Sequence, residues 1–523
     1  MISRCWTPTT KLVLLTSVAL FSFGSATAVA QNAPAGVVGT ISPEATEALS
    51  PAVEVTEAEL EAMLKRRDAI REATSSKGGG TARGADRSSR QTLEAAETEA
   101  NSIRRNFRNT RAQAVSSTLA EPAAANDGAE VFYSGNTYFS RSADRGATWI
   151  ADTIPGGPAD ATIPCCDPDV VHHSALDTTF AIILYTNAAQ TNGAVRIFVR
   201  RGLVSGGNDC TYLIDPGGLN NNVLPDYPHI AVSNNFVYLT TNNIRNGAWI
   251  GSQIRRFNAS QMANCQTAST LTLTYIGGDG QRILTPVEGA TTTMYFGLNR
   301  TANLFRVLRL AESATSLSVF DRSLPHGSNF VNPDCRGGTG NFDFIERTTS
   351  WSIAGFRLRG AVIPGNRLWF VWNSGPDASH TQAHIHSAIL TEPGLTLLTS
   401  NAVFNNTTCF GYPTIGGNPF GEFGITFAVG GRKFGGGTAA RGAIAVDDAA
   451  SAGNFFPTYS ITASGTHNRS DGRYGDYFTL RKNDGCSRGW VATNYALLNG
   501  NTASSHVNAR YIEFQSSLQA ACP

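Results

Sequence analysis

Residues 167–215 read DPDVVHHSALDTTFAIILYTNAAQTNGAVRIFVRRGLVSGGNDCTYLID. A proline-containing turn opens this stretch, and three short apolar runs follow at Phe180–Tyr185, Val195–Arg200 and Tyr212–Asp215. Runs of this length that are rich in β-branched and aromatic residues are typical of β-strands. Together with the apolar segment directly after the turn, they predict one unit of four strands.

The unit recurs along the chain with a nearly constant period. Pro168 and Pro228 are 60 residues apart, Pro228 and Pro286 are 58 apart, and Pro286 and Pro413 are 127 apart, which is two periods. Four-stranded units repeated in this way are typical of β-propellers, in which each unit forms one blade. The units open at Glu121-Pro122, Asp167-Pro168-Asp169, Asp226-Tyr227-Pro228, Thr285-Pro286, Trp351-Ser352, Tyr412-Pro413 and Gly475-Asp476-Tyr477.

We therefore predict an all-β protein in which residues 113–515 form a seven-bladed β-propeller, followed by a tail at residues 516–523. Six or eight blades are the alternatives. The last unit shows three strands, so we expect a strand at about residues 114–119 to complete it and to close the ring.

Residues 1–30 have the features of a secretory signal peptide. Arg4 and Lys11 precede an apolar run at Leu12–Phe23, and Ala28-Val29-Ala30 is a small-x-small cleavage site. The apolar run is shorter than the roughly 20 residues that span a bilayer. We expect cleavage near Ala30 and a secreted or periplasmic mature chain without a membrane span.

Residues 31–112 differ in composition from the rest of the chain. Between Glu44 and Arg111 there are 12 acidic and 12 basic side chains and almost no aromatic residues. A capping box at Thr56 and Glu59 predicts a helix to about residue 73, and a second helix is predicted from about residue 92 to residue 111. Apolar residues are too sparse for an independent core, so we interpret this segment as a charged helical stalk, linker or propeptide. An inhibitory pro-segment that covers a cleft is the alternative.

Cysteine usage agrees with export, and the net charge argues against a nucleic-acid partner. Eight cysteines remain once Cys5 is removed with the signal peptide, and an even number in an exported chain favours disulfides. The balance of 41 Lys and Arg against 40 Asp and Glu provides no basic field for nucleic acid. If the blade order holds, the pairs are Cys165–Cys166, Cys210–Cys265, Cys335–Cys409 and Cys486–Cys522.

The turn at residues 142–149 reads Ser-Ala-Asp-Arg-Gly-Ala-Thr-Trp. It resembles the Asp-box (BNR repeat), the S-x-D-x-G-x-T-W turn of sialidase-like propellers. The resemblance implies a structural role for Ser142, Asp144, Gly146 and Trp149. Asp144 then accepts backbone amides between the third and fourth strands, Gly146 takes a positive φ, and Trp149 packs into the blade.

The wider chain also resembles exported bacterial propellers of this kind, through Val131–Asn136, Cys165–Asp167, Leu368–Trp372 and Arg473–Tyr477. True sialidases carry an arginine triad and an Arg-Ile-Pro motif before the first Asp-box. No such motif precedes Ser142, and the triad cannot be placed, so we do not expect sialidase activity.

Polar residues at the entrances to the innermost strands ring the central channel of a propeller, and they are the candidate site. Carboxylates that converge on one cavity push their pKa values apart, which creates an acid and a base. The alternative is that each Asp caps its own strand through local hydrogen bonds. The catalytic candidates are Asp476, Tyr477, Asp226, Tyr227, His229 and Asp167, and the ligand-binding candidates are Arg473, Asp169 and Arg282.

Two groups of residues have the chemistry of metal ligands. Asp167 and Asp169 with nearby carbonyls are an alternative calcium site. His380, His384 and His386 have metal-like spacing, but we interpret them as surface residues without an acidic partner and assign no metal ligands.

The sequence therefore predicts an exported propeller that binds or cleaves a glycan at its central channel, as a glycoside hydrolase or a polysaccharide lyase. A lyase would use His229 and Tyr227 as base and acid. The alternative from another class is a non-catalytic propeller scaffold that binds a protein or a surface. An enzyme should gather a carboxylate pair and arginines in the channel, whereas a scaffold should fill it with apolar side chains.

Overall fold

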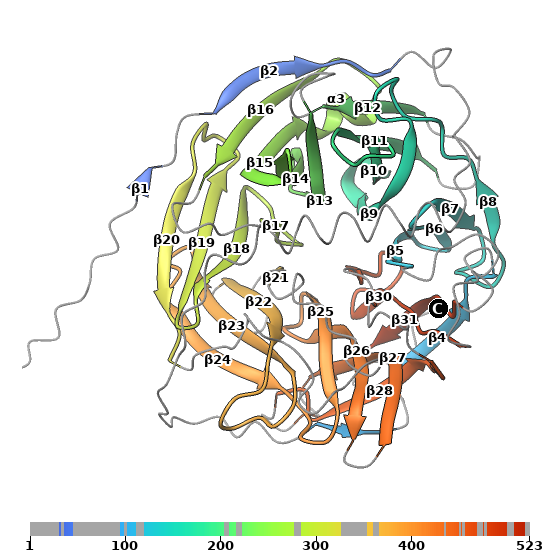
Figure 1. Cartoon of the computed structure of the whole chain (residues 1–523), viewed down its shortest axis with the longest axis vertical. Helices are drawn as coiled ribbons and strands as arrows, with labels where there is room; N and C mark the ends of the chain where they lie inside the picture. The colour runs from blue at the N-terminus through green and yellow to red at the C-terminus, as the bar shows by residue number, and fades with distance from the viewer. Residues whose placement is uncertain are drawn as a thin grey trace, which may run out of the picture.

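The computed structural model describes residues 31–32, 36–44, 95–98, 102–110, 120–202, 209–215, 222–276, 284–325, 353–358, 366–433, 436–448, 451, 455–467, 474, 478–498 and 507–517. Within these residues the strands form seven sheets of four or five strands each. The sheets stand around a common centre in Figure 1. The prediction of an all-β, seven-bladed propeller is confirmed.

Within each blade the strands follow one another outward from an innermost strand (Figure 1), and in the seventh blade the outermost strand comes from the N-terminal region. The first blade contains β5 (Ala123–Asp127), β6 (Glu130–Gly135), β7 (Tyr138–Ser142) and β8 (Ile150–Asp152). The second contains β9 (Ile163–His173), β10 (Thr178–Thr186), β11 (Gly193–Arg201) and β12 (Cys210–Ile214). The third contains β13 (Val223–Val232), β14 (Phe236–Arg245), β15 (Ala248–Asn258) and β16 (Ala268–Tyr275), with β2 (Val37–Ile41) at its outer edge.

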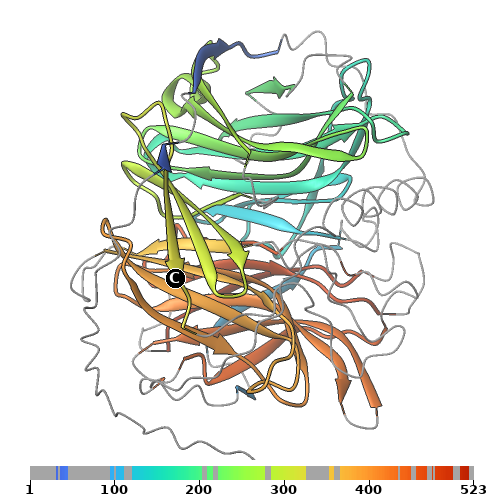
Figure 2. The same cartoon turned by 60° about the vertical axis from the view of Figure 1, so that its left-hand side comes forward.

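The remaining four blades follow the same order (Figure 2). The fourth contains β17 (Thr285–Pro286), β18 (Thr293–Thr301), β19 (Leu304–Ala311) and β20 (Ser318–Ser323), edged by β1 (Gln31–Asn32). The fifth contains β21 (Ile353–Leu358), β22 (Asn366–Ser374), β23 (His384–Glu392) and β24 (Leu397–Val403). The sixth contains β25 (Cys409–Gly417), β26 (Phe423–Lys433), β27 (Gly436–Asp447) and β28 (Thr458–Ala463), edged by β3 (Ala96–Glu97). The seventh contains β29 (Leu480–Lys482), β30 (Gly489–Asn494), β31 (Arg510–Gln515) and β4 (Ile103–Arg108).

Two short helical pieces lie within these ranges. A 3₁₀ turn, η2, covers Ser174–Leu176, and α3 covers Ala259–Ala263. The side chain of Asn258 caps α3 by accepting the backbone N–H of Gln261 at 2.9 Å.

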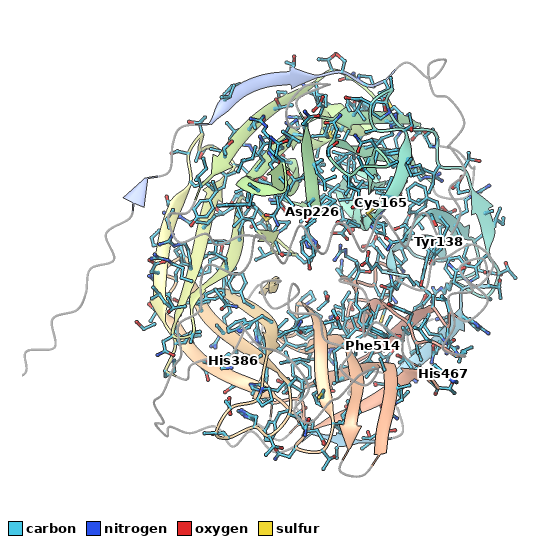
Figure 3. The ribbon with its side chains drawn as sticks, in the orientation of Figure 1. Tyr138, Cys165, Asp226, His386, His467 and Phe514 are labelled. Atoms are coloured by element: carbon cyan, nitrogen blue, oxygen red, sulfur yellow. A yellow bond between two sulfur atoms is a disulfide. The ribbon has the colours of Figure 1, made fainter. Side chains whose placement is uncertain are left out.

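The core lies between blades that pack face to face. All nine residues of β10 are buried, because both faces of a middle strand meet a neighbouring blade. This explains why its sequence is a continuous apolar run rather than an alternating one. Phe139 of β7 makes edge-to-face contacts with Phe132 of β6 at 5.1 Å and with Phe198 of β11, in the next blade, at 4.9 Å. Figure 3 shows side chains filling these spaces.

The ring closes between the first and last blades. The N-terminal strand β4 pairs with β31 and supplies the outermost strand of the seventh blade. Near the axis, Thr493 Oγ1 donates to the carbonyl of Pro122 at 2.5 Å, and the N–H of Ala124 donates to Thr479 Oγ1 at 3.0 Å. The predicted closing strand therefore exists, but it is Ile103–Arg108 rather than 114–119.

The second predicted helix, over residues 92–111, is wrong. Residues of this segment form β3 and β4, and β1 and β2 from the same N-terminal region pair with the outer edges of two other blades. An outer strand presents unpaired N–H and C=O groups, and pairing with this segment satisfies them. The signal peptide and the first predicted helix lie outside the described residues.

Three innermost strands share a bulge at an X-Pro step. Asp167, Tyr227 and Tyr412 have φ values of 57°, 56° and 54°, and each precedes a proline. The N–H of each is held by a side chain of the preceding blade. Asn136 Oδ1 accepts from Asp167 at 3.1 Å, Asp167 Oδ2 from Tyr227 at 3.1 Å, and Asn373 Oδ1 from Tyr412 at 2.8 Å.

Disulfides join Cys165 to Cys166 and Cys210 to Cys265, as predicted. Cys409 and Cys486 are also disulfide-bonded. Their predicted partners, Cys335 and Cys522, lie outside the described residues. None of the helices within the described ranges has the length and hydropathy needed to cross a bilayer.

Candidate functional site

A pocket of about 470 Å³ lies at the centre of the ring. Its lining comes from the ends of innermost strands, and from the turns that follow them, in six of the seven blades. This volume is within the range of pockets that bind small organic ligands. The polar residues that matter for the chemistry below are His172, Asn234, Glu288, Asn418, Arg481 and Asp484.

The pocket opens on the face that carries the Asp-box turn. In a four-stranded meander, the turn between the first two strands and the turn between the last two lie at the same end. The N–H of Arg145, in the β7–β8 turn, donates to the carbonyl of Ala129, in the β5–β6 turn, at 2.9 Å. The entrances to the innermost strands, where the sequence predicts the site, lie at the opposite end of the channel, and several fall outside the described residues.

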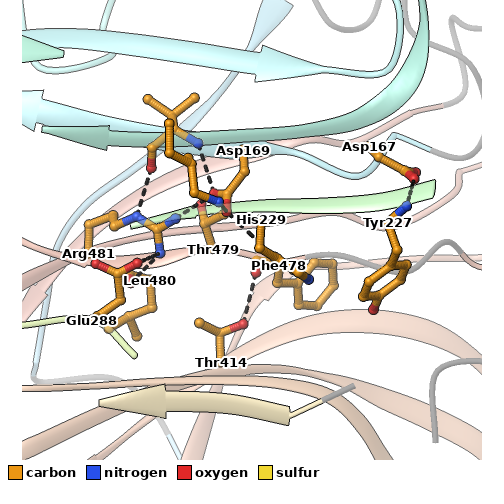
Figure 4. Close-up of polar contacts among 12 residues, drawn as sticks. Asp167, Asp169, Tyr227, His229, Glu288, Thr414, Phe478, Thr479, Leu480 and Arg481 are labelled. Atoms are coloured by element: carbon orange, nitrogen blue, oxygen red, sulfur yellow. Dashed lines mark hydrogen bonds and ion pairs between the residues drawn. The ribbon is translucent and has the colours of Figure 1, made fainter. Parts of the chain in front are cut away.

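A buried charge network lies near the axis, and two of its members, Glu288 and Arg481, line the pocket. Arg481 of β29 forms ion pairs with Asp169 of β9 and with Glu288, which follows β17, where Nη1 lies 3.2 Å from the Glu288 carboxylate (Figure 4). Its Nε donates to the carbonyl of Val170 at 2.7 Å. His229 Nδ1 lies 3.5 Å from Asp169 Oδ2. Side chains from four blades therefore meet near the axis.

The two carboxyl groups of this network differ in protonation. Burial alone would raise the pKa of Asp169, but Arg481, His229 and the N–H of Ile230 outweigh it and hold the pKa below its ordinary value. Burial raises the pKa of Glu288 to about 7, although Arg481 opposes this rise and the charge of Asp169 adds to it. Asp169 is thus an ionised carboxylate, and Glu288 exchanges a proton near neutral pH.

The rim of the pocket carries a second polar cluster. His172 Nε2 lies 3.8 Å from Asp484 Oδ2, and Asp484 Oδ1 accepts a hydrogen bond from Ser174 Oγ at 2.6 Å. Burial lowers the pKa of His172. Burial, a hydrogen bond that the protonated side chain donates to Asp177, and the charges of nearby carboxylates raise the pKa of Asp127 to about 6. The rim therefore also contains groups that can hold or release a proton.

Two of the sequence-predicted site residues belong to the network, and three lie elsewhere. Asp169 and His229 contact each other. Asp167 instead holds the N–H of Tyr227, whose ring packs edge-on against His229 at 5.0 Å. Asp226 is buried in β13 opposite Asn242. Arg282, Arg473, Asp476 and Tyr477 lie outside the described residues, so their assignment stays a prediction.

Both aspartates of the Asp167-Pro168-Asp169 turn already accept hydrogen bonds. Asp169 accepts from the N–H groups of Val170 and Ile230 at 2.8 and 3.1 Å and pairs with Arg481. A calcium ion would have to displace these donors. The calcium hypothesis stays a prediction.

Sequence reasoning missed Glu288 and Arg481. Glu288 follows the Thr285-Pro286 opening by two residues, so its position just after a predicted strand entrance is the signal that points to it. Arg481 lies within the last innermost strand and carries no local signal. Only the ring closure brings it beside Asp169 and Glu288.

The Asp-box turn is held by its own side chains. Asp144 Oδ1 accepts from Ser142 Oγ at 2.7 Å and from the N–H of Thr148 at 2.8 Å, while Gly146 has φ of 86°. Trp149 packs edge-on against Tyr133 at 5.2 Å and Tyr511 at 6.0 Å. These contacts tie the first blade to the last and place no side chain of the turn in the pocket.

The interpretation of His384 and His386 as surface residues is wrong, whereas His380 is partly exposed. His384 and His386 are buried in β23, because this strand lies between two others of its blade. An acidic partner also exists, since Asp377 precedes His380 by three residues and lies 3.0 Å from its Nδ1.

No protein-family model and no curated protein matches the sequence. Solved structures do resemble it. They include a GH93 α-L-arabinofuranosidase of Fusarium graminearum with arabinobiose, at 8% identity over 81% of this chain and 97% of that chain, with a TM-score of 0.40. A Trypanosoma rangeli sialidase has 9% identity over 60% of this chain and 53% of that chain, with a TM-score of 0.35. A Penicillium chrysogenum α-L-arabinanase with arabinobiose has 8% identity over 77% and 94%, with a TM-score of 0.36. At these identities the likeness concerns the fold alone.

Proposed function

We propose that this chain binds a glycan in the central pocket and hydrolyses a glycosidic bond there, with Glu288 as the proton donor. The observation that carries the proposal is the ion pair of Glu288 with Arg481 on the pocket wall. Glu288 is 17% exposed and Arg481 is 8% exposed, so both are largely desolvated yet open to the cavity. Buried charges cost stability unless they are paired, and in a cleft they are candidates for function.

The pocket lining favours a ligand rich in hydroxyl groups. Its polar groups include the side chains of Asn234, Asn418 and Ser174 and the charged groups of Lys482 and Asp484. Amides and hydroxyls both donate and accept hydrogen bonds, which matches the alternating needs of sugar hydroxyls. The apolar parts of the lining supply contact for the sugar ring faces.

Hydrolysis requires a second carboxylate beside the acid. Asp484 lies on the pocket lining with Glu288, where it accepts a hydrogen bond from Ser174 Oγ at 2.6 Å and lies 3.6 Å from Lys482 Nζ. In the proposed step Glu288 protonates the leaving oxygen as the glycosidic bond breaks. Water attacks the anomeric carbon, and Asp484 takes the proton of that water. Asp169 acts through Arg481 by fixing its position.

The rival functions have different requirements. A scaffold propeller needs no charges in its channel, whereas Asp169, Glu288, Arg481 and His229 place four ionisable side chains there. A lyase built on His229 and Tyr227 would need both at the pocket surface. Neither residue is on its lining.

We also propose that the chain works outside the cytoplasm. The described cysteines are all disulfide-bonded, which is typical of oxidising compartments. The signal peptide predicted at residues 1–30 is the expected route.

The test is an activity screen of the folded protein on neutral and acidic polysaccharides, with reducing ends and unsaturated-sugar absorbance read together. The proposal predicts new reducing ends without the absorbance, and it predicts that Asp484→Asn lowers the rate by about 100-fold or more. Unsaturated-sugar absorbance together with reducing ends would identify a lyase. No signal from any polysaccharide tested would favour a non-catalytic scaffold propeller.

A further inference from the structure

A second cluster of metal-type ligands lies outside the pocket, on the connection from β22 to β23 in the fifth blade. Asp377, His380 and His384 each direct one ligand atom toward the others, and these atoms all lie within 4.8 Å of one another. The connection runs from residue 375 to residue 383 and lies at the end of the blade opposite to the Asp-box face, since it joins the second and third strands.

The separations match the edge of a tetrahedral coordination shell. His380 Nδ1 lies 3.0 Å from both oxygens of Asp377, and His384 Nε2 lies 3.7 Å from Asp377 Oδ2. Tetrahedral ligands at the bond lengths typical of zinc, about 2.0–2.1 Å, are about 3.3 Å apart. The observed distances lie on both sides of this value, so an ion requires only small side-chain adjustments.

His384 supplies an independent reason to expect a cation. Its Nδ1 lies 3.3 Å from the carbonyl of Gln382, and a carbonyl only accepts, so Nδ1 carries the proton and Nε2 carries a lone pair. The side chain is fully buried, and Nε2 has no hydrogen-bond partner among the described residues. It faces the Asp377 carboxylate, which also only accepts when ionised. A buried acceptor without a donor is costly, and a metal ion between these groups removes that cost.

The surroundings hold the three ligands in place. The N–H groups of Ser379 and His380 donate to Asp377 Oδ1 at 2.7 and 2.8 Å, which fixes the carboxylate. The ring of Phe404 packs edge-on against His380 at 4.5 Å. His384 is in a regular strand, so its ring is positioned by the blade itself.

We propose that Asp377, His380 and His384 bind a zinc ion, with one coordination position open to water or to a ligand. Two imidazoles and one carboxylate favour zinc over calcium and magnesium, which prefer oxygen ligands. Asp377 and His380 are 26% and 16% exposed, which gives the ion a path from solvent. The site is independent of the proposed glycan hydrolysis.

The test is zinc titration of the full chain without a polyhistidine tag, after treatment with a chelator, by calorimetry. Zinc chloride is the only ligand added. We expect one equivalent per chain. We expect His380→Ala and Asp377→Asn each to weaken binding by about 100-fold or more, because changing residues that only hydrogen-bond to a metal ligand already costs about 10–100-fold. Cobalt in place of zinc should give the visible absorption of a four-coordinate centre, which these variants should lose.

The matched control is His172→Ala. His172 belongs with Asp127 and Asp484 to the other described group of potential metal ligands, at the pocket rim. The His172→Ala variant should still bind one zinc ion per chain. The proposal is overturned if the folded wild-type protein shows no saturable zinc binding, if binding persists unchanged in both Asp377→Asn and His380→Ala, or if it disappears in His172→Ala instead. Asp377→Asn changes a partly exposed side chain by one atom, so it keeps the test valid if His380→Ala fails to fold.

Discussion

The carboxylate of Asp167 accepts the backbone N–H of Tyr227 across a blade boundary, with 3.1 Å between Oδ2 and N. The equivalent backbone N–H groups in two other blades have the same kind of partner. Asn136 accepts the N–H of Asp167, and Asn373 accepts the N–H of Tyr412. A side chain of one blade thus satisfies the bulged backbone of the next. This contact gives Asp167 a role in joining blades.

We predict that Asp167→Ala destabilises the propeller by about 1–3 kcal/mol, because it leaves the buried N–H of Tyr227 without an acceptor. Asp167→Asn keeps an acceptor, as Asn136 and Asn373 do at the equivalent positions, and should cost less. Urea unfolding of the three proteins measures the difference. Equal stability of Asp167→Ala and wild type would contradict this role.

The stability of the protein should fall as pH rises through the range where Glu288 ionises. Its pKa is about 7 in the folded chain against an ordinary value of 4.5, so the folded state binds more protons between these values. Stability attributable to Glu288 is therefore greatest at low pH and is lost toward neutral pH. Glu288→Gln should remove roughly 2–3 kcal/mol of this pH dependence between about pH 4.5 and pH 8.

The measurement is the free energy of unfolding of the wild-type and Glu288→Gln proteins across this range. Asp127 contributes a trend of the same sign, but it is present in both proteins and cancels in the difference. Parallel profiles would show that Glu288 is not perturbed.

The Asp-box glycine should be more sensitive than other glycines with positive φ. A Cβ on Gly146 would lie 2.6 Å from Cδ1 of Tyr511, whereas a Cβ on Gly128 would meet nothing within 4 Å. Both have positive φ, at 86° and 56°. We expect Gly128→Ala to cost about 1–2 kcal/mol from backbone strain alone, and Gly146→Ala to cost more. Thermal unfolding would show the order, and a reversed order would argue against tight packing of the turn on the last blade.

The N-terminal strand β4 should be required for folding. A chain that begins at residue 113 lacks Ile103–Arg108 and leaves the edge of β31 open, so we expect aggregation or a large loss of stability. A chain that begins at residue 95 keeps β3 and β4 and should fold. Circular dichroism and size-exclusion chromatography of both chains provide the measurement. A soluble, folded chain from residue 113 would contradict the closure.

The blades were predictable because each carries its signal in its own sequence. The prolines of Asp167-Pro168, Tyr227-Pro228 and Tyr412-Pro413 mark the same bulge in the innermost strands of the second, third and sixth blades, so their spacing reflects the blade period. Buried middle strands such as β10 appear as continuous apolar runs. At the X-Pro bulges and in the buried middle strands, the structure that the local sequence favours is the one that the propeller requires.

The strand β4 was not predictable in this way. Its sequence, Ile-Arg-Arg-Asn-Phe-Arg, is highly charged and lies in a segment with a helical pattern. It becomes a strand because the edge of β31 needs a partner, and that requirement comes from the other end of the chain.

The site was predictable in part. Asp169 and His229 were found because they stand beside the X-Pro steps. Arg481 and Glu288 were missed because they belong to different blades far apart in the sequence, and only the closed ring makes them neighbours. The partner of His380 was missed for a different reason. Asp377 was outside the histidine run, and a tight turn brings it back onto the ring of His380.

The most direct test of the proposed function is the rate at which Glu288→Gln cleaves a glycan that the wild-type protein cleaves. The control is Glu97→Gln, which removes a charge at the outer edge of the sixth blade. A proton donor contributes about 10²–10⁴-fold to the rate, so we predict a loss of this size for Glu288→Gln, with folding and glycan binding retained, and no loss for the control. A Glu288→Gln protein that is folded and cleaves at the wild-type rate would contradict the account.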